Sequence, residues 1–378
     1  MEEEWRALVE NGTWESEDPG RLTVGRKAIR TKWVFKRKLK GDGSVARYEA
    51  RLVTQGFSQV EGEGFFETSA PVARMSTLRT IFSMAVEHDF ELEGMDVDAA
   101  YLNASVEEGL FVKLPPEFSP FSRDIPFVRC LRKSLYRLKQ SGRNRNNTLD
   151  DFLVGIGLQR STTDLCFYFS RDEGGETDLL MVVYVDDLVI ARRREKVDKF
   201  KHNISRRFKM KDLGSLSRVL RIEVRRDRPN GTISISQGGY IREVLRRYGI
   251  DECRVVPIPV DGKVKILAPE SADKPSESKP LGAVLGMVGP LIYALTGTRS
   301  DIAYTVYQAA RRMEDPCRED FSTRKRIFRY LSTVPDLGIT FGGKSNNGHP
   351  EDVDNRKSTT GYVFKLNGSA ISWCSRNQ

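Results

Sequence analysis

The stretch Leu179–Ala191, LLMVVYVDDLVIA, constrains the fold more than any other part of the sequence. It is an apolar run rich in β-branched residues, and its only charges are two adjacent carboxylates, Asp186 and Asp187. Such runs are typical of buried strands, where an unpaired carboxylate is very unfavourable. Because neighbouring residues of a straight strand point to opposite faces, the pattern predicts strands Leu179–Val185 and Leu188–Ala191 joined by a tight turn at the aspartates. A cation should face this turn, and Mg²⁺ suits oxygen ligands.

A solvated Asp-Asp hairpin is the alternative, since aspartate is common in turns. A second acidic motif bears on this choice, because residues 95–103, MDVDAAYLN, place Asp96 and Asp98 at the end of a strand-like segment, Phe90–Val97. Two strands that each deliver an aspartate to one point would form a two-metal site, which supports in-line phosphoryl displacement. The competing interpretation of Asp96 and Asp98 is a helix N-terminal cap.

Together these motifs resemble the reverse transcriptase of copia-type LTR retrotransposons, in which YVDD lies in an apolar hairpin. Further segments resemble that family in the same order: TKWVFKRKLKGDGSVARYEARLVTQGFSQ, APVARMSTLRTIFSMA, LRKSLYRLKQSGR, MKDLGSLSRVLRIEV and TRSDIAYTVYQAARRMEDP. The resemblance extends from about Gly12 to Arg376. It implies a fragment of a Pol polyprotein that carries out RNA- or DNA-templated DNA synthesis.

The fold implied by the resemblance is α+β, with the fingers and palm of a right-hand polymerase and a ferredoxin-like palm sheet. A helical thumb or connection and partial ribonuclease H-like strands would follow. The expected ranges are 12–260 for fingers and palm, 261–280 for a linker, 281–335 for the helices and 336–378 for a truncated ribonuclease H-like segment. Residues 342–353, GGKSNNGHPEDV, lack that domain's first acidic motif, so no ribonuclease H activity is expected.

The resemblance also implies roles for individual residues. Catalysis would fall to three carboxylates: Asp96, Asp186 and Asp187. The same three and Val97 would contact two Mg²⁺ ions, with Mn²⁺ as a substitute. The incoming dNTP would meet Lys32, Arg51, Tyr101 and Gln140, with the Tyr101 ring packed under the sugar. Ordinary core packing of Tyr101 and an exposed loop position for Gln140 are the alternatives.

Four residues depart from the family pattern. Arginine replaces a usual glycine at Arg137 and Arg221, and a usual tryptophan at Arg145, while Glu49 stands where lysine is usual. A glycine position can require a backbone that other residues adopt only with strain. Loss of a large apolar anchor is also destabilising if the site is buried. These departures favour a second hypothesis, a decayed retrotransposon relic that at most binds nucleic acid, so the sequence leaves open whether this copy is an enzyme.

The net charge of the chain also favours a nucleic acid as partner. Lysine and arginine outnumber acidic residues by 61 to 52, for a formal charge of +9. This excess favours a polyanion such as an RNA or DNA template–primer. A basic hairpin with apolar stems is expected within Arg26–Phe57, turning at residues 41–43, and it could clamp phosphates or simply be solvated.

The cellular setting is only broadly indicated. No apolar run approaches the roughly 20 residues that span a bilayer, so no membrane partner is expected. The acidic N-terminus, MEEEWRALVE, is unlike a secretory signal, and five scattered cysteines suit a reducing compartment. We therefore expect an intracellular protein, in the cytoplasm, in a virus-like particle or in the nucleus. The oligomeric state is not indicated by the sequence.

Overall fold

The computed structural model describes residues 1–15, 27–39, 44–106, 109–117, 128–260, 281–310, 313, 318–343 and 359–377. Helices and sheets are mixed along the chain, as the sequence predicts. The chain forms two compact units. The first comprises Met1–Ala73, Met95–Leu188 and Glu195–Leu213, and the second Arg74–Gly94, Val189–Arg194 and Gly214–Gln378. Each unit combines stretches that are separate in the sequence. This division therefore does not test the continuous domain ranges expected from the sequence, and those ranges stay a prediction. The expected linker, 261–280, lies outside the described residues.

The basic hairpin opens the first unit. Strands β1 (Ile29–Leu39) and β2 (Val45–Thr54) pair antiparallel, with Val34 opposite Arg51 and Lys36 opposite Glu49. Strand β1 also pairs with β4 (Phe111–Lys113), and β4 pairs with β5 (Val128–Cys130), in the order β2-β1-β4-β5. The hairpin predicted from the sequence is confirmed, although its turn at residues 41–43 lies outside the described residues.

An apolar core anchors this sheet. Helix α1 (Glu2–Glu10) contributes Leu8, which is buried with Leu52 of β2, Leu102 and Leu138. Leu102 belongs to the short 3₁₀ helix η3 (Ala100–Asn103), so the residues just after the MDVD motif share a core with the basic hairpin. A second 3₁₀ turn, η2 (Gly56–Ser58), follows β2.

The aspartate hairpin lies in the centre of the largest sheet. Strands β8 (Thr177–Tyr184) and β9 (Asp187–Arg192) are its two arms, as predicted, and the apolar residues of both are buried. The sheet has the order β10-β3-β9-β8-β7-β6. Its other strands are β3 (Glu91–Val97), β6 (Gln159–Arg160), β7 (Phe167–Arg171) and β10 (Met210–Ser215). Strands β8 and β9 are buried on both faces along most of their length, which explains why their sequences are continuously apolar.

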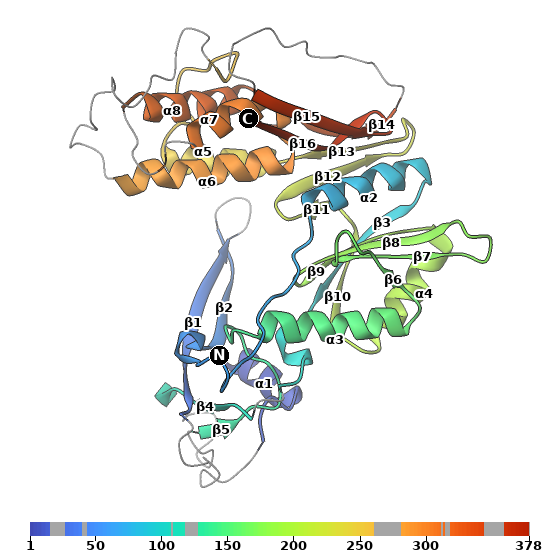
Figure 1. The fold of residues 1–378 in the computed structure, drawn as a ribbon, viewed down its shortest axis with the longest axis vertical. Coiled ribbons are helices and arrows are strands. Elements are labelled where there is room, and N and C mark those ends of the chain that lie inside the picture. Colours follow the sequence, from blue (N-terminus) through green and yellow to red (C-terminus); the bar gives the residue numbers. More distant parts are fainter. Residues whose placement is uncertain are drawn as a thin grey trace. The chain divides into compact units, whose positions relative to one another are not determined.

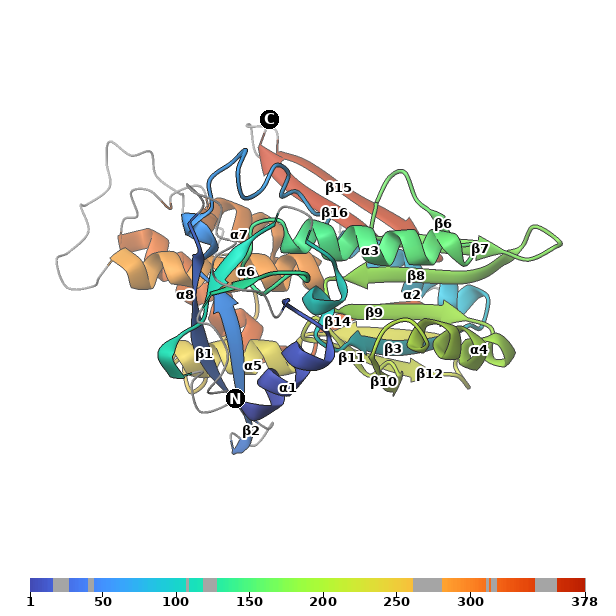
Figure 2. The same ribbon diagram turned by 90° about the horizontal axis from the view of Figure 1, so that it is seen from below.

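Two helices accompany these strands. Helix α3 (Ser141–Gly155) contacts η3 and β6, and its axis runs in nearly the same direction as β7 and β8 (Figures 1 and 2). It begins at Ser141, which places Arg145 in its first turns. Helix α4 (Arg194–Ser205) carries the basic run that follows β9.

Besides helix α2 (Met75–Glu87), the described residues of the second unit form four helices and two small sheets. The helices are α5 (Gly238–Tyr248), α6 (Leu281–Gly297), α7 (Ala303–Ala310) and α8 (Arg318–Thr333), which share one apolar core, and a 3₁₀ turn, η6 (Ser300–Ile302), precedes α7. One sheet has the order β11-β12-β13-β14, formed by Arg218–Val219, Ile222–Asp227, Thr232–Ser236 and Gly338–Gly342. No helix in the described part of the chain is both long enough and apolar enough to cross a bilayer.

The C-terminal strands β15 (Thr359–Leu366) and β16 (Ser369–Asn377) form a two-stranded ribbon. Helix α2 (Met75–Glu87) holds this ribbon through buried Arg79, which donates hydrogen bonds to the carbonyls of Ile371 (2.7 Å) and Thr296 (2.7 Å). The guanidinium also lies over the Trp373 ring at 4.0 Å, and burial lowers its pKa to about 10. The likeness of this ribbon to ribonuclease H stays a prediction.

Both arginines that stand at expected glycine positions adopt left-handed backbone conformations, with φ of +69° at Arg137 and +57° at Arg221. The strain expected at these positions is therefore present. Left-handed geometry costs an L-residue roughly 1–2 kcal/mol. At Arg221, an ion pair with Glu243 (3.1 Å) offsets part of this free-energy cost.

We expect Arg137→Gly to stabilise the protein, because glycine adopts this φ without strain. The net gain should be about 0.5–1 kcal/mol, since glycine also adds entropy to the unfolded chain. The midpoint of urea unfolding measures it. Arg143→Gly, within α3, is the matched control and should lose about 1 kcal/mol. A loss at both positions would contradict the strain at Arg137.

Candidate active site

A backbone hydrogen bond joins the two acidic motifs. The N–H of Val97, at the end of β3, donates to the carbonyl of Asp186 in the hairpin turn (3.0 Å). On the other side, the N–H of Asp98 donates to the carbonyl of Lys209 (2.9 Å). The end of β3 is thus fixed between the aspartate turn and the start of β10, in agreement with the strand order β10-β3-β9. Asp96 therefore lies beside Asp186 and Asp187, although some ninety residues separate them in the sequence.

The turn itself has an unfavourable backbone. Val185 has φ of +54° and is 43% exposed. A β-branched residue in the left-handed region is a conformational outlier, and such strain gathers at functional sites. The single left-handed residue reverses the chain between β8 and β9, so that Asp186 and Asp187 leave the sheet where β3 ends.

The three carboxylates repel one another. Burial raises the pKa of Asp187, and the charges of Asp96 and Asp186 raise it further. Burial likewise raises the pKa of Asp186; the Arg145 cation opposes this rise, and Asp96 adds to it. The pKa of Asp96 is raised by burial and then by Asp98. Ionising all three groups is therefore unfavourable unless a cation joins them.

A hard divalent cation matches the chemistry of these groups. All three side chains offer carboxylate oxygens, and the buried Oδ1 of Asp186 has no hydrogen-bond partner among the described residues. No three Asp, Glu, His or Cys side chains of the described residues are grouped closely enough to hold a metal ion by themselves. Mg²⁺ commonly binds one or two carboxylates and completes its shell with water and substrate phosphates. The donor atoms are of the kind that Mg²⁺ prefers, and the described side chains would supply only part of its coordination shell.

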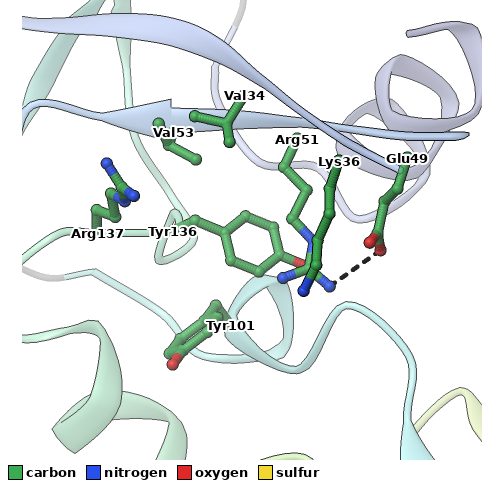
Figure 3. A pocket seen from close by; sticks show the side chains of 8 residues that line it. All are labelled: Val34, Lys36, Glu49, Arg51, Val53, Tyr101, Tyr136 and Arg137. Atoms are coloured by element: carbon green, nitrogen blue, oxygen red, sulfur yellow. Dashed lines mark hydrogen bonds and ion pairs between the residues drawn. The ribbon is translucent and has the colours of Figure 1, made fainter. Parts of the chain in front are cut away.

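A cavity of about 270 Å³ lies in the same unit, slightly below the range of about 300–1,000 Å³ usual for ligand pockets. Figure 3 shows its lining: Val34, Lys36, Glu49, Arg51, Val53, Tyr101, Tyr136 and Arg137. The alternation of β1 and β2 directs the first five of these side chains to one face of the hairpin. The cavity therefore has a basic wall and an aromatic wall.

The aromatic wall connects the cavity to the aspartates. The rings of Tyr101 and Tyr136 meet edge to face with centroids 5.2 Å apart, and the Arg51 guanidinium lies 4.9 Å from the Tyr136 centroid. Burial raises the pKa of Tyr101, and the Asp186 carboxylate raises it further. Tyr101 thus lines the cavity and is also close enough to Asp186 for that carboxylate to raise its pKa.

The basic wall contains one acid. Glu49 pairs with Arg51 at 3.1 Å, with Lys38 at 3.5 Å and, more loosely, with Arg47 at 4.0 Å. Burial alone would raise its pKa, but Arg51 and Lys38 together lower it. Glu49 is therefore ionised, and it neutralises part of the positive charge that faces the cavity.

The residues expected from the sequence divide into two groups. Arg51 and Tyr101 line the cavity. Lys32 is exposed opposite Val53, outside the lining, and Gln140 is 1% exposed at the start of α3. The amide of Gln140 accepts from Gln59 (3.0 Å) and donates to the carbonyl of Gly64 (2.9 Å). Gln140 is thus neither an exposed loop residue nor part of the cavity wall.

Asp98 does not cap a helix: η3 has Ala99 at its N-cap, without a side-chain cap. Two polar residues of the cavity wall, Lys36 and Tyr136, were not predicted from the sequence. Lys36 lies two residues after Val34 and so on the same face of β1. Only the pairing of Lys36 with Glu49 shows that this face lines the cavity. Tyr136 lies in irregular backbone and gave no periodic signal.

Comparisons with known proteins agree with these motifs. The sequence profile of the family described as reverse transcriptase (RNA-dependent DNA polymerase) matches residues 15–262. The whole chain aligns with the retrovirus-related Pol polyprotein from transposon TNT 1-94 of Nicotiana tabacum at 35% identity, covering 29% of that protein. It aligns likewise with the Pol polyprotein from transposon RE1 of Arabidopsis thaliana at 32% identity, covering 26%.

The chain thus spans less than a third of the length of these relatives. The profile covers the basic hairpin, both acidic motifs and every residue that lines the cavity. The resemblance to copia-type Pol polyproteins is confirmed, and the chain belongs to the reverse transcriptase (RNA-dependent DNA polymerase) family.

Proposed function

We propose that this chain catalyses DNA synthesis on an RNA or DNA template–primer, using deoxynucleoside triphosphates. The observation that supports this most is the hydrogen bond from Val97 to Asp186, which joins two acidic motifs beside an open basic cavity. In this proposal the β1–β2 sheet forms the fingers, the six-stranded sheet forms the palm, and the helices α6 to α8 form the thumb or connection.

Each group near the cavity has a role in this proposal. Asp96, Asp186 and Asp187, with the backbone of Val97, would hold the metal ions. Two Mg²⁺ ions, when bound, would lower the pKa of the primer 3′-hydroxyl and neutralise the charge of the departing pyrophosphate. Arg51 and Lys36 would bind the triphosphate as charged donors. Tyr101 would support the sugar and exclude a 2′-hydroxyl sterically.

A nucleic-acid-binding relic without catalysis is the second candidate. Its support is the strain at Arg137 and Arg221, together with the charge of Arg145 at the aspartates. All three carboxylates are nevertheless present and adjacent, which favours the catalytic proposal. Binding of a duplex without extension of its primer would identify the relic.

The decisive experiment is primer extension with Mg²⁺. We expect Asp186→Asn to abolish incorporation, because one metal ligand becomes neutral, while the affinity for primer–template stays at the wild-type level. Asp151→Asn, at an exposed position of α3, is the matched control and should extend normally. Normal extension by Asp186→Asn would refute the site, and a wild-type protein that binds but never extends would support the relic.

The stability of the metal-free protein should depend on Asp187. Its pKa lies above the ordinary 3.8 because of burial, Asp96 and Asp186, so the folded state binds the proton more tightly than the unfolded state. Stability is then fully present below 3.8 and is lost as pH rises through the raised pKa. We expect metal-free Asp187→Asn to unfold at higher urea than wild type at neutral pH, with a gap that narrows toward pH 3.8.

Added Mg²⁺ provides the control for this prediction. It should stabilise the wild type more than Asp187→Asn, because the ion relieves a repulsion that the variant no longer has. A variant that is less stable than wild type at every pH would show that the three carboxylates do not repel one another.

Neutralising Glu49 should strengthen nucleotide binding. Glu49 competes with a triphosphate for Arg51, so Glu49→Gln should lower the KM for dNTP by about two- to fivefold, the worth of a partly exposed ion pair. Steady-state primer extension measures this KM. Glu63→Gln, at an exposed position, should leave it unchanged. A higher KM in Glu49→Gln would mean that Glu49 positions Arg51 and does not compete for it.

A further inference from the structure

The ring of Tyr136 lines the cavity and has no role in the mechanism proposed above. It meets the Tyr101 ring edge to face, with centroids 5.2 Å apart and 73° between the ring planes. The Arg51 guanidinium lies 4.9 Å from the Tyr136 centroid, and Figure 3 shows the Tyr136 ring between these two side chains. One aromatic ring therefore contacts both the residue that would bind the triphosphate and the residue that would support the sugar.

The backbone of Tyr136 is attached to the basic hairpin. Its carbonyl accepts two hydrogen bonds from buried Thr54 at the end of β2, one from the backbone N–H (2.9 Å) and one from the side-chain hydroxyl (3.0 Å). Tyr136 also forms a parallel bridge with Val53, another residue of the cavity wall. Because Arg51 belongs to the same strand, β2 both supplies the cation and holds the ring that the cation contacts.

The residues that follow Tyr136 are attached to the same part of the chain. The backbone N–H of Lys139 donates to the side-chain oxygen of Gln59 (2.9 Å), and the Gln59 amide donates to the side chain of Gln140 (3.0 Å). Both glutamines are buried. The segment that carries Tyr136 is thus held by hydrogen bonds along its length, so the ring is presented to the cavity from a fixed backbone.

We propose that Tyr136 is a positioning residue for sugar selection, because its ring holds Tyr101 in place beside the nucleotide whose triphosphate Arg51 binds. This inference rests on the proposed function, since it takes Tyr101 as the residue that excludes a 2′-hydroxyl. A steric filter works only when its bulky group cannot move aside. Edge-to-face contact between aromatic rings is directional, and a cation near the same ring adds attraction, so Tyr136 can fix both neighbours.

Discrimination between dATP and ATP tests this inference. It is measured as the ratio of kcat/KM for the two nucleotides in primer extension by the full chain. We expect Tyr136→Leu to lower this ratio about tenfold, the upper range for loss of an edge-to-face aromatic pair, because Tyr101 then yields to the 2′-hydroxyl. Tyr136→Phe keeps the ring and should restore most of the ratio. Tyr136→Met is a second aliphatic variant, in case the leucine variant does not fold.

A double-mutant cycle shows whether Tyr136 acts through Tyr101. Tyr101→Ala removes the filter, so adding Tyr136→Leu to that variant should leave the ratio where Tyr101→Ala set it. A ratio that still changes would mean that Tyr136 acts on the sugar without Tyr101, contrary to the inference. A ratio as low in Tyr136→Phe as in Tyr136→Leu would also overturn it, because the ring would then not be the supporting group.

Tyr48→Leu is the matched control. Tyr48 lies in β2 of the same unit and is 77% exposed. It precedes Glu49 in the strand, so its side chain points to the face opposite the cavity. The same ring is lost, and the ratio should match that of the wild type. A fall as large as in Tyr136→Leu would show that the effect is not specific to the cavity wall.

Two results separate failure of the inference from failure of the proposed function. If Tyr101→Ala lowers the ratio while both aliphatic variants of Tyr136 discriminate as the wild type does, the nucleotide site stands and the role of Tyr136 is refuted. If the wild-type chain does not extend a primer, or if Tyr101→Ala leaves the ratio unchanged, the proposed function or its sugar filter fails, and the inference fails with it.

Discussion

The mutual repulsion of three half-buried carboxylates is the constraint on which the rest of the site depends. Asp96 is fixed beside Asp186 by one backbone hydrogen bond from Val97, and the sheet on either side leaves the aspartates little freedom to separate. The fold therefore imposes a concentration of negative charge that an unfolded chain would disperse. A bound cation would offset the electrostatic free energy of this repulsion. The stability of the site is therefore coupled to cation binding.

The structure moderates this repulsion with its own cations. Burial raises the pKa of Asp186 and of Asp96; Arg145 opposes the rise at Asp186, and Lys211, Lys38 and Arg47 oppose the rise at Asp96. In the cavity the signs are reversed, because the Glu49 carboxylate pairs with Arg51 and reduces the positive charge of the lining. Charge at both halves of the site is thus partly balanced before any ligand arrives. Such balance favours a folded chain without ligands, and under the proposed function it would weaken the attraction for metal and triphosphate.

Backbone strain lies close to the same residues. Val185 in the aspartate turn and Arg137 in the cavity wall both have positive φ, which glycine would adopt without strain. The carbonyl of Arg137 also lies where a side chain on Gly56 would be, at 2.0 Å from an ideal Cβ, so the loop requires glycine on its other side. This close approach fixes the backbone next to Tyr136, whose ring contacts both Arg51 and Tyr101.

The sequence by itself determined the local elements of this site. Continuous apolar runs predicted β8 and β9, alternation and a turn predicted the basic hairpin, and the acidic pairs marked the ends of strands. These features follow from periodicity and from the free energy of burying charge, both of which act over a few residues. That Asp96 and Asp186 meet was a hypothesis drawn from the two acidic motifs, but no local pattern fixed the strand order β3-β9 that brings them together.

Tertiary structure alone decided which side chains meet. The sequence could not show that Gln140 is buried against Gln59 and Gly64, that Tyr136 faces Arg51, or that Arg145 is buried. A substitution such as tryptophan to arginine appears in the sequence as the loss of an apolar anchor. Its electrostatic effect depends on distance and burial, and these are properties of packed elements that lie far apart along the chain.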